Sequence, residues 1–136
     1  MKKLSLFFIA FSLLIAGCKS NAAADKVKIK NTTDKNLVCV LGYNYPDLTF
    51  SFTSKQALLA KMDLLGVGAG QTKEIDTLGM CKQEVWDNNI KHSMLMLMVF
   101  DKDKLSSSDK LEDALVERYY FTYVQLMKTK GVITIK

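Results

Sequence analysis

The chain has 136 residues, of which 49% are hydrophobic and 24% are charged, and its formal net charge is +5 at pH 7. That length is enough for one domain with one core. The basic residues are scattered singly, as in VKIK and DKDK, with no run interleaved with aromatic residues. Such scattered charge indicates a solvated surface and argues against nucleic acid as a partner.

The first residues have the order of a bacterial signal peptide. Lys2 and Lys3 provide a positive start, and Leu4–Ile15 is apolar apart from two serines. This stretch is shorter than the roughly 20 residues that a membrane-spanning helix needs, but it suits the apolar region of a signal peptide. Ala16 and Gly17 then supply the small residues of a cleavage site.

A cysteine follows these small residues directly. The segment LLIAGC, Leu13–Cys18, resembles the bacterial lipobox, in which Leu, a variable residue and Ala or Gly precede a cysteine. In that motif the thiol receives a diacylglycerol, and cleavage leaves the cysteine as the acylated N-terminus. We therefore expect residues 1–17 to be a lipoprotein signal peptide and Cys18 to carry the lipid. The alternative is an ordinary signal peptide with an incidental cysteine.

Acyl chains such as palmitate at Cys18 would hold the mature protein at a membrane surface, because each buried methylene adds about 0.8 kcal/mol. Residues 18–26, CKSNAAADK, are small and polar and are typical of a tether; residues 27–136 then form a single domain. Position two after cleavage is Lys19, not the aspartate associated with inner-membrane retention, and no acidic cluster follows. We expect an outer-membrane lipoprotein that faces the periplasm.

Strands open the predicted domain. The elements of its first half are strands over 27–30, 37–45 and 48–53, a helix over 55–65 and a flexible glycine loop over 66–70. The strands alternate apolar and polar residues, and NTTDKN over 31–36 supplies a turn between the first two. Ser54 is placed to cap the helix.

The second half combines one strongly apolar strand with short helices. Its elements are an edge strand over 71–75, a central strand over 93–100, a loop over 101–108, helices over 111–119 and 124–128, and a final strand over 132–136. Asp109 with Glu112, and Thr122 with Gln125, have the spacing of capping boxes. The predicted fold is mainly β: an antiparallel β-sandwich, immunoglobulin- or transthyretin-like, with six or seven strands and short helical additions near the C-terminus.

Two cysteines, Cys39 and Cys81, remain after acylation of Cys18. An even count in an oxidising compartment favours a disulfide between them. The alternative is two buried thiols that behave as small hydrophobic side chains. Alternation in the strand places Cys39 on the same inward face as Leu37 and Leu41, and Cys81 falls in a predicted loop.

One acidic stretch has oxygen ligands near the spacing of a calcium loop. Within Asp101–Glu112, the acids at 101, 103, 109 and 112 and the serine at 107 would occupy ligand positions. Leu105 and Ser106 stand where an oxygen ligand and a glycine belong. We therefore predict a solvated loop followed by a helix cap, and no metal site.

No catalytic constellation or cofactor site is visible in the sequence. His92 is the only histidine, so neither a histidine pair for zinc nor a Ser-His-Asp triad can be assembled. Met94, Met96 and Met98 share one strand face and could bind copper as thioethers. The opposite face is equally apolar, which favours a buried central strand instead.

Several motifs along the domain match a pattern of structural residues. These are NTTDKNLVCVLGYNYPD over 31–47, LMLMVFDKDKL over 95–105, ERYYFTYVQL over 117–126 and VITI over 132–135. They resemble small Bacteroidetes lipoproteins and secreted proteins of unknown function. Lys102 and Tyr120 depart from that pattern, in which a small residue and an aspartate are usual. The resemblance implies an envelope location and a sandwich fold, and no activity.

Together these observations predict a lipid-anchored envelope protein that is not an enzyme. We expect a binding or structural module held to the membrane through the lipid at Cys18, with an envelope protein or a glycan as its partner. The alternatives are an accessory subunit of an envelope hydrolase, which would need paired carboxylates in a cleft, and a metal-binding envelope protein.

Overall fold

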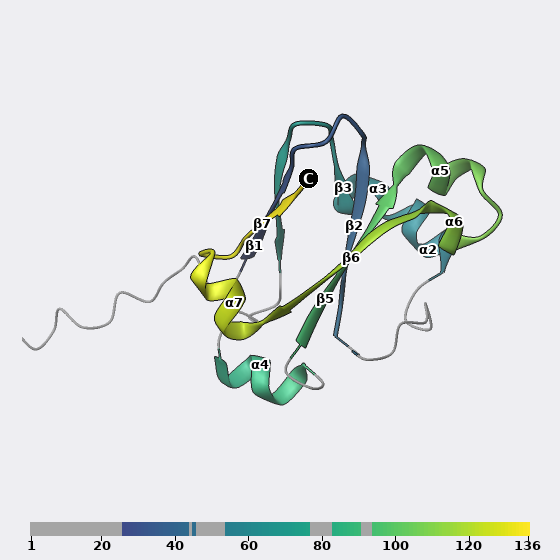
Figure 1. Cartoon of the computed structure of the whole chain (residues 1–136). Coiled ribbons are helices and arrows are strands. Elements are labelled where there is room, and N and C mark those ends of the chain that lie inside the picture. Colours follow the sequence, from purple (N-terminus) through teal and green to yellow (C-terminus); the bar gives the residue numbers. More distant parts are fainter. Residues whose placement is uncertain (1–25, 44, 46–53, 77–82, 91–93) are drawn as a thin grey trace, which may run out of the picture.

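The computed structural model describes residues 26–43, 45, 54–76, 83–90 and 94–136 (Figure 1). Its strands are β1 (Lys26–Asn31), β2 (Leu37–Gly42), β3 (Gly66–Val67), β4 (Thr72–Asp76), β5 (Met94–Asp101), β6 (Leu115–Thr122) and β7 (Val132–Ile135). Its helices are α2 (Lys55–Ala60), α3 (Met62–Leu65), α4 (Gln83–Asn89), α5 (Lys102–Ser107), α6 (Leu111–Ala114) and α7 (Tyr123–Lys128). The fold is mainly β, as predicted.

The strands form two sheets, ordered β4-β1-β7 and β3-β2-β5-β6, which is consistent with the predicted sandwich. All pairings are antiparallel except that of β1 with β7, where Lys28 lies opposite Val132 in a parallel register. The prediction of wholly antiparallel sheets is therefore wrong at this pair. The helices are also not confined to the C-terminal part, since α2, α3 and α4 precede β5.

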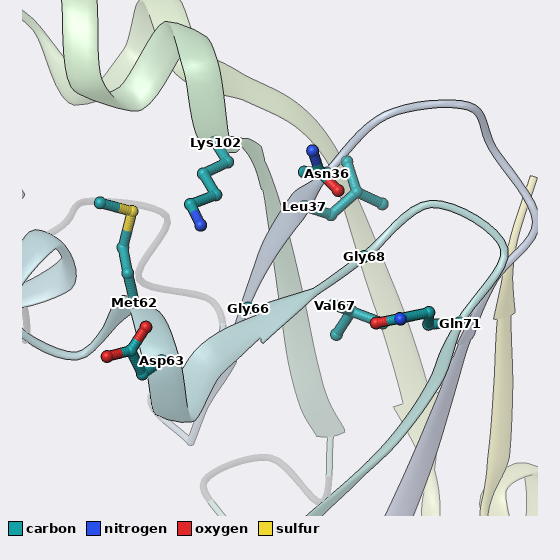
Figure 2. A pocket seen from close by; sticks show the side chains of 9 residues that line it. All are labelled: Asn36, Leu37, Met62, Asp63, Gly66, Val67, Gly68, Gln71 and Lys102. Atoms are coloured by element: carbon teal, nitrogen blue, oxygen red, sulfur yellow. The ribbon is translucent and has the colours of Figure 1, made fainter.

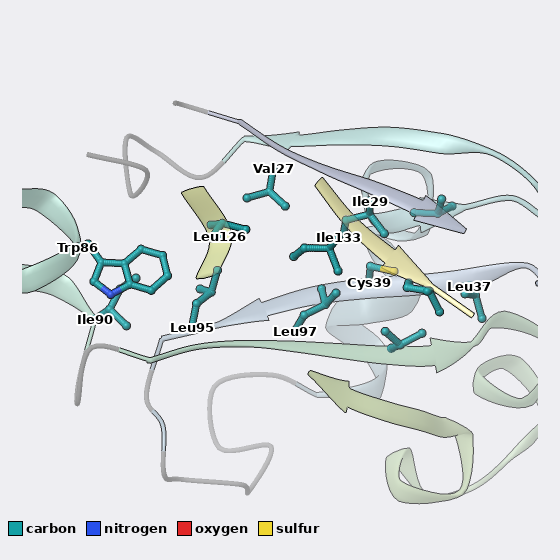
Figure 3. Close-up of a cluster of buried hydrophobic side chains, with 13 residues drawn as sticks. Val27, Ile29, Leu37, Cys39, Trp86, Ile90, Leu95, Leu97, Leu126 and Ile133 are labelled. Atoms are coloured by element: carbon teal, nitrogen blue, oxygen red, sulfur yellow. The ribbon is translucent and has the colours of Figure 1, made fainter. Parts of the chain in front are cut away.

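β5 forms the centre of the structure, as its sequence predicts. Seven of its eight residues are buried, and their side chains divide between two clusters. Leu95, Leu97 and Val99 face the space between the sheets (Figure 3). Met96, Met98 and Phe100 pack on the other side, against buried residues of α2, α5 and α6. Burying each of these side chains contributes about 1.5–3 kcal/mol, and the methionines serve as core residues.

Two of the predicted helix caps are present. The Ser54 side chain accepts a hydrogen bond from the Ala57 N–H at 3.2 Å and begins α2, and α3 continues the same apolar stretch. Thr122 and Gln125 form the predicted capping box: the Gln125 N–H donates to the Thr122 hydroxyl at 3.3 Å, and the Thr122 N–H donates to the Gln125 side chain at 2.8 Å.

The stretch from Asp101 to Thr122 differs from the prediction. Lys102–Ser107 is a helix and not a loop, because Asp101 caps it: the Asp101 carboxylate accepts from the N–H groups of Asp103 and Lys104 at 3.0 and 3.1 Å. The predicted Asp109–Glu112 capping box is wrong. The N-cap residue of α6 is Lys110, without a side-chain cap.

The predicted helix over 111–119 ends at Ala114, and β6 follows. Its β-branched and aromatic residues, in VERYYFT, favour a strand, and pairing with β5 fixes the strand with Leu97 opposite Tyr119. Elsewhere the predicted strands β1, β2, β4 and β7 are confirmed, and β4 is an edge strand. Residues 66–67 of the glycine loop are strand β3, and the predicted strand over 48–53 lies outside the described residues.

The cap at Asp101 can be tested with Asp109 as a matched control. We expect Asp101→Ala to lower the free energy of unfolding by about 0.5–2 kcal/mol, because two N–H groups of α5 lose their acceptor. Asp109→Ala, at an exposed position outside either cap, should change it by less than about 0.5 kcal/mol. Denaturant melts with calcium and with chelator should agree for every variant. Calcium-dependent stabilisation of the wild type that Asp101→Ala abolishes would restore the calcium-loop interpretation.

Candidate functional site

A buried asparagine organises one end of the sandwich. Asn31 is the last residue of β1 and is 0% exposed, and the turn over 32–36 carries the chain from β1 in one sheet to β2 in the other. The Asn31 amide nitrogen lies 2.7 Å from the Lys35 carbonyl oxygen, 3.2 Å from that of Val67 and 3.0 Å from that of Gly68. It therefore joins β1, the turn and the β3 loop.

The amide oxygen of Asn31 shapes the turn itself. It accepts from the Thr33 N–H at 3.0 Å and from the Thr33 hydroxyl at 2.7 Å. Both ends of this buried amide are thus satisfied, as burial of a polar side chain requires. Next to it, the Thr32 N–H and hydroxyl donate to the Ile135 carbonyl at 3.0 and 2.6 Å and attach the turn to β7.

We call the hydrogen bonds of the Asn31 amide the clamp. A cavity of about 240 Å³ lies beside it (Figure 2). It is lined by Asn36, Leu37, Met62, Asp63, Gly66, Val67, Gly68, Gln71 and Lys102. We call it the polar pocket. Three segments hold its walls together: the Asn36 side chain accepts from the Ala69 N–H at 3.3 Å, and the Asn36 carbonyl accepts from the Lys102 N–H at 2.9 Å. The walls are therefore fixed to the core strands.

Lys73, a lysine of β4, fixes the wall of the pocket that Asp63 and Gly66 form. The Lys73 ammonium donates to the carbonyl oxygens of Asp63 at 2.6 Å and Gly66 at 3.0 Å. A cation at the carboxyl end of α3 satisfies carbonyls that the helix leaves unpaired. This contact leaves the Asp63 carboxylate available at the pocket, because only its backbone oxygen is engaged by Lys73.

The polar pocket offers charged, polar and apolar groups that can recognise a ligand. Lys102 supplies an ammonium donor, Asp63 a carboxylate acceptor, and Gln71 an amide that can act as either (Figure 2). Met62 and Leu37 add apolar surface. Among the described residues that line it, none is Ser, Cys, Thr or His. The arrangement suits a small polar group, or a polar side chain of a larger partner, with complementary charges.

A second cavity of about 240 Å³ lies at the same end of the sandwich, next to β6 and the end of β7. Its lining residues are Thr33, Asp34, Lys35, Leu37, Val116, Glu117, Tyr119, Ile135 and Lys136. Burial raises the pKa of the Tyr119 phenol, and the charge of Glu117 raises it further. The phenol of Tyr119 is a group of this cavity that can donate or accept a hydrogen bond.

Of the site residues predicted from the sequence, Cys39 is described by the structure, and it lines neither pocket. Cys18, Cys81 and His92 lie outside the described residues. Cys39 is buried in the inner cluster between the sheets, as its alternation predicts (Figure 3). Burial raises the pKa of its thiol from 9.0 to about 12, and the charge of Lys73 offsets only part of this rise. The pairing of Cys39 with Cys81 stays a prediction.

Asp101, the first residue of the calcium-like stretch, is engaged in helix capping and lies 3.7 Å from the Lys35 ammonium. In the described part of the chain, no group of three or more His, Cys, Asp or Glu side chains could hold a metal ion. Over the same residues, no helix is long and apolar enough to cross a bilayer. Comparisons with known protein families, curated proteins and solved structures found no match to this chain.

Sequence reasoning recognised the turn but not its use. NTTDKN predicts a turn from composition alone, yet its first and last residues, Asn31 and Asn36, hold the walls of the polar pocket. The signal was the position of Asn31, where alternation along KVKIKN places it on the buried face of β1. Lys102 and Asp63 carry no local signature, because the pocket joins residues from distant segments.

The Cys39 thiol gives the reduced protein a pH-dependent stability. Its pKa is about 12 in the folded chain and 9.0 for an ordinary thiol. Stability from the neutral thiol is therefore complete below pH 9 and falls as the pH rises toward 12, by up to about 4 kcal/mol. Denaturant unfolding in reductant at pH 8 and 10.5 should show a larger loss for wild type than for Cys39→Val. Equal losses of unfolding free energy in wild type and Cys39→Val would contradict a buried thiol at position 39. If Cys39 is in a disulfide, the difference between the two proteins should disappear when reductant is omitted.

Proposed function

We propose that this chain is a lipid-anchored protein of the bacterial envelope, attached through Cys18 to the outer membrane and facing the periplasm. The observation that carries the proposal is the segment LLIAGC, which follows a positive start and an apolar run in the order of a lipoprotein signal. The residues after Cys18 are small and polar up to Lys26, where β1 begins. The order is therefore signal, lipid site, tether and folded domain.

We further propose that the domain is a non-enzymatic binding module whose partner is an envelope protein or a glycan. The polar pocket supports this, because Lys102 and Asp63 present opposite charges from α5 and α3 beside the Gln71 amide. Two hydrogen bonds fix its walls: the Asn36 side chain accepts from the Ala69 N–H, and the Lys73 ammonium donates to the Gly66 carbonyl. A preorganised polar surface favours recognition, since little conformational freedom is lost on binding.

The sandwich type is also a proposal. In an immunoglobulin constant-type domain the first two strands are neighbours in one sheet, whereas β1 and β2 here lie in different sheets. We therefore favour the transthyretin-like type of the two that the sequence predicted. The motifs over 31–47 and 95–105 support kinship with the small Bacteroidetes lipoproteins that they resemble.

The anchor is tested by replacing the acylated thiol. Cells that produce the full-length chain and are fed radiolabelled palmitate should label the wild type, and Cys18→Ser should lose the label and accumulate as unprocessed precursor. Cys39→Val removes a different thiol and should be labelled like the wild type. A wild-type protein that is retained in membranes without an acyl label would refute the lipid anchor.

A further inference from the structure

We propose that the domain rests on the bilayer through the outer face of α7, and that both cavities open away from that membrane. The contact surface consists of Val124, Lys128 and Lys130, which we call the α7 face. Its occupant is an anionic lipid surface, the headgroup layer of the membrane that holds the acyl chains. This inference rests on the lipid anchor proposed at Cys18.

The start of β1 determines which end of the domain lies near the lipid. Eight positions separate Cys18 from Lys26, and a chain of that length spans at most about 27 Å. α7 lies beside that start: the Lys28 N–H donates to the Gly131 carbonyl at 2.8 Å, and the Gly131 N–H donates to the Leu126 carbonyl at 2.9 Å. β1, which the tether precedes in the sequence, therefore begins next to α7 (Figure 1).

The turn after α7 requires its glycine and fixes this position. Gly131 has a φ of 72°, and a Cβ there would lie 3.3 Å from the Lys26 carbonyl oxygen. Lys130 also has a positive φ, of 53°. These two left-handed residues end the helix and return the chain directly into β7. They keep Lys130 close to Lys26, where β1 begins.

The chemistry of the α7 face suits an anionic bilayer. Val124 is 72% exposed, although it is a large hydrophobic residue. Lys128 follows one helical turn later, on the same side of the helix, and Lys130 is exposed as well. The whole segment 123–131, YVQLMKTKG, contains no acidic residue. An exposed apolar side chain followed by two lysines can combine apolar contact with attraction to anionic headgroups, as helices that lie on membrane surfaces do.

The neighbouring helix determines which side of this end touches the lipid. α4 packs beside α7, with the rings of Trp86 and Tyr123 5.7 Å apart. Its exposed acids, Glu84 and Asp87, would be repelled by anionic headgroups. The domain should therefore tilt toward α7 and away from α4.

The cavities lie at the opposite end of β1. That strand runs from Lys26 beside the tether to Asn31 in the clamp, a length of about 17 Å. Both cavities include residues of the turn that follows Asn31: Asn36 lines the polar pocket, and residues 33–35 line the second cavity. With α7 on the bilayer they face outward, where a soluble partner or a glycan can reach them.

Lysine footprinting of the intact acylated protein tests this orientation. The protein is placed in vesicles of phosphatidylcholine and phosphatidylglycerol, or in detergent micelles, and treated with an acetylating reagent that does not cross membranes. Lys128 and Lys130 should react about fivefold more slowly in these vesicles than in micelles, the factor that corresponds to about 1 kcal/mol per lysine at an anionic surface. Lys35 and Lys102, at the pocket end, should react equally in both.

Acetylation and acylation are both read by mass spectrometry of the peptides, and the spectra separate the anchor proposal from the orientation proposal. Absence of an acyl group from Cys18 would refute the anchor. An acylated Cys18 with equal reactivity of Lys128 and Lys130 in vesicles and micelles, or with protection of Lys35 and Lys102 instead, would overturn the orientation alone. In the wild type, Lys26 lies next to the α7 face and should also react more slowly in vesicles than in micelles. Lys128→Glu combined with Lys130→Glu, at exposed positions that leave the core unchanged, should remove this protection of Lys26. If the protection persists in the double variant, the α7 face is not the contact.

Discussion

The buried amide of Asn31 is the interaction on which the pocket end of this protein depends. It ends the first strand, and its nitrogen contacts carbonyl oxygens of the turn and of the β3 loop. A buried amide with all its partners in place specifies one arrangement, because any other would leave polar groups unpaired in the interior. The turn into β2 and the wall that carries Gly68 and Gln71 are thus fixed together, and with them the polar pocket.

This constraint gives the domain two ends with different chemistry. At one end β1 begins beside α7, where exposed Val124 and the neighbouring lysines suit a lipid surface. At the other end, the clamp and the turn shape two cavities, of which the polar pocket is lined by Lys102 and Asp63. The apolar strand β5 connects the ends as the shared core of both clusters. The proposed function uses this division: one end is held by the membrane, and the other meets a partner.

The sequence predicted those elements whose pattern is local. Alternation in VKIK predicted a strand and its buried face, and the run of apolar residues in β5 predicted a strand buried on both faces. Ser54 and Thr122 marked the starts of α2 and α7. It failed where tertiary pairing overrides a local signal: LVERYY has helical spacing, but pairing with β5 makes it a strand. It also missed the α5 cap, since residues 101–108 were predicted to be a loop. The polar pocket could not be predicted from the sequence, because its lining residues come from segments that are distant along the chain.

The free energy of unfolding of Asn31→Asp, compared with Asn36→Asp, tests the clamp most directly. At Asn31 the change replaces a donor by a carboxylate oxygen that faces three carbonyl oxygens, so we expect a loss of at least about 3 kcal/mol at pH 7. Exposed Asn36 uses its side chain as an acceptor from the Ala69 N–H, a role that aspartate keeps, and the loss should stay below about 1 kcal/mol. Equal losses for both variants, or an Asn31→Asp protein as stable as the wild type, would contradict the account.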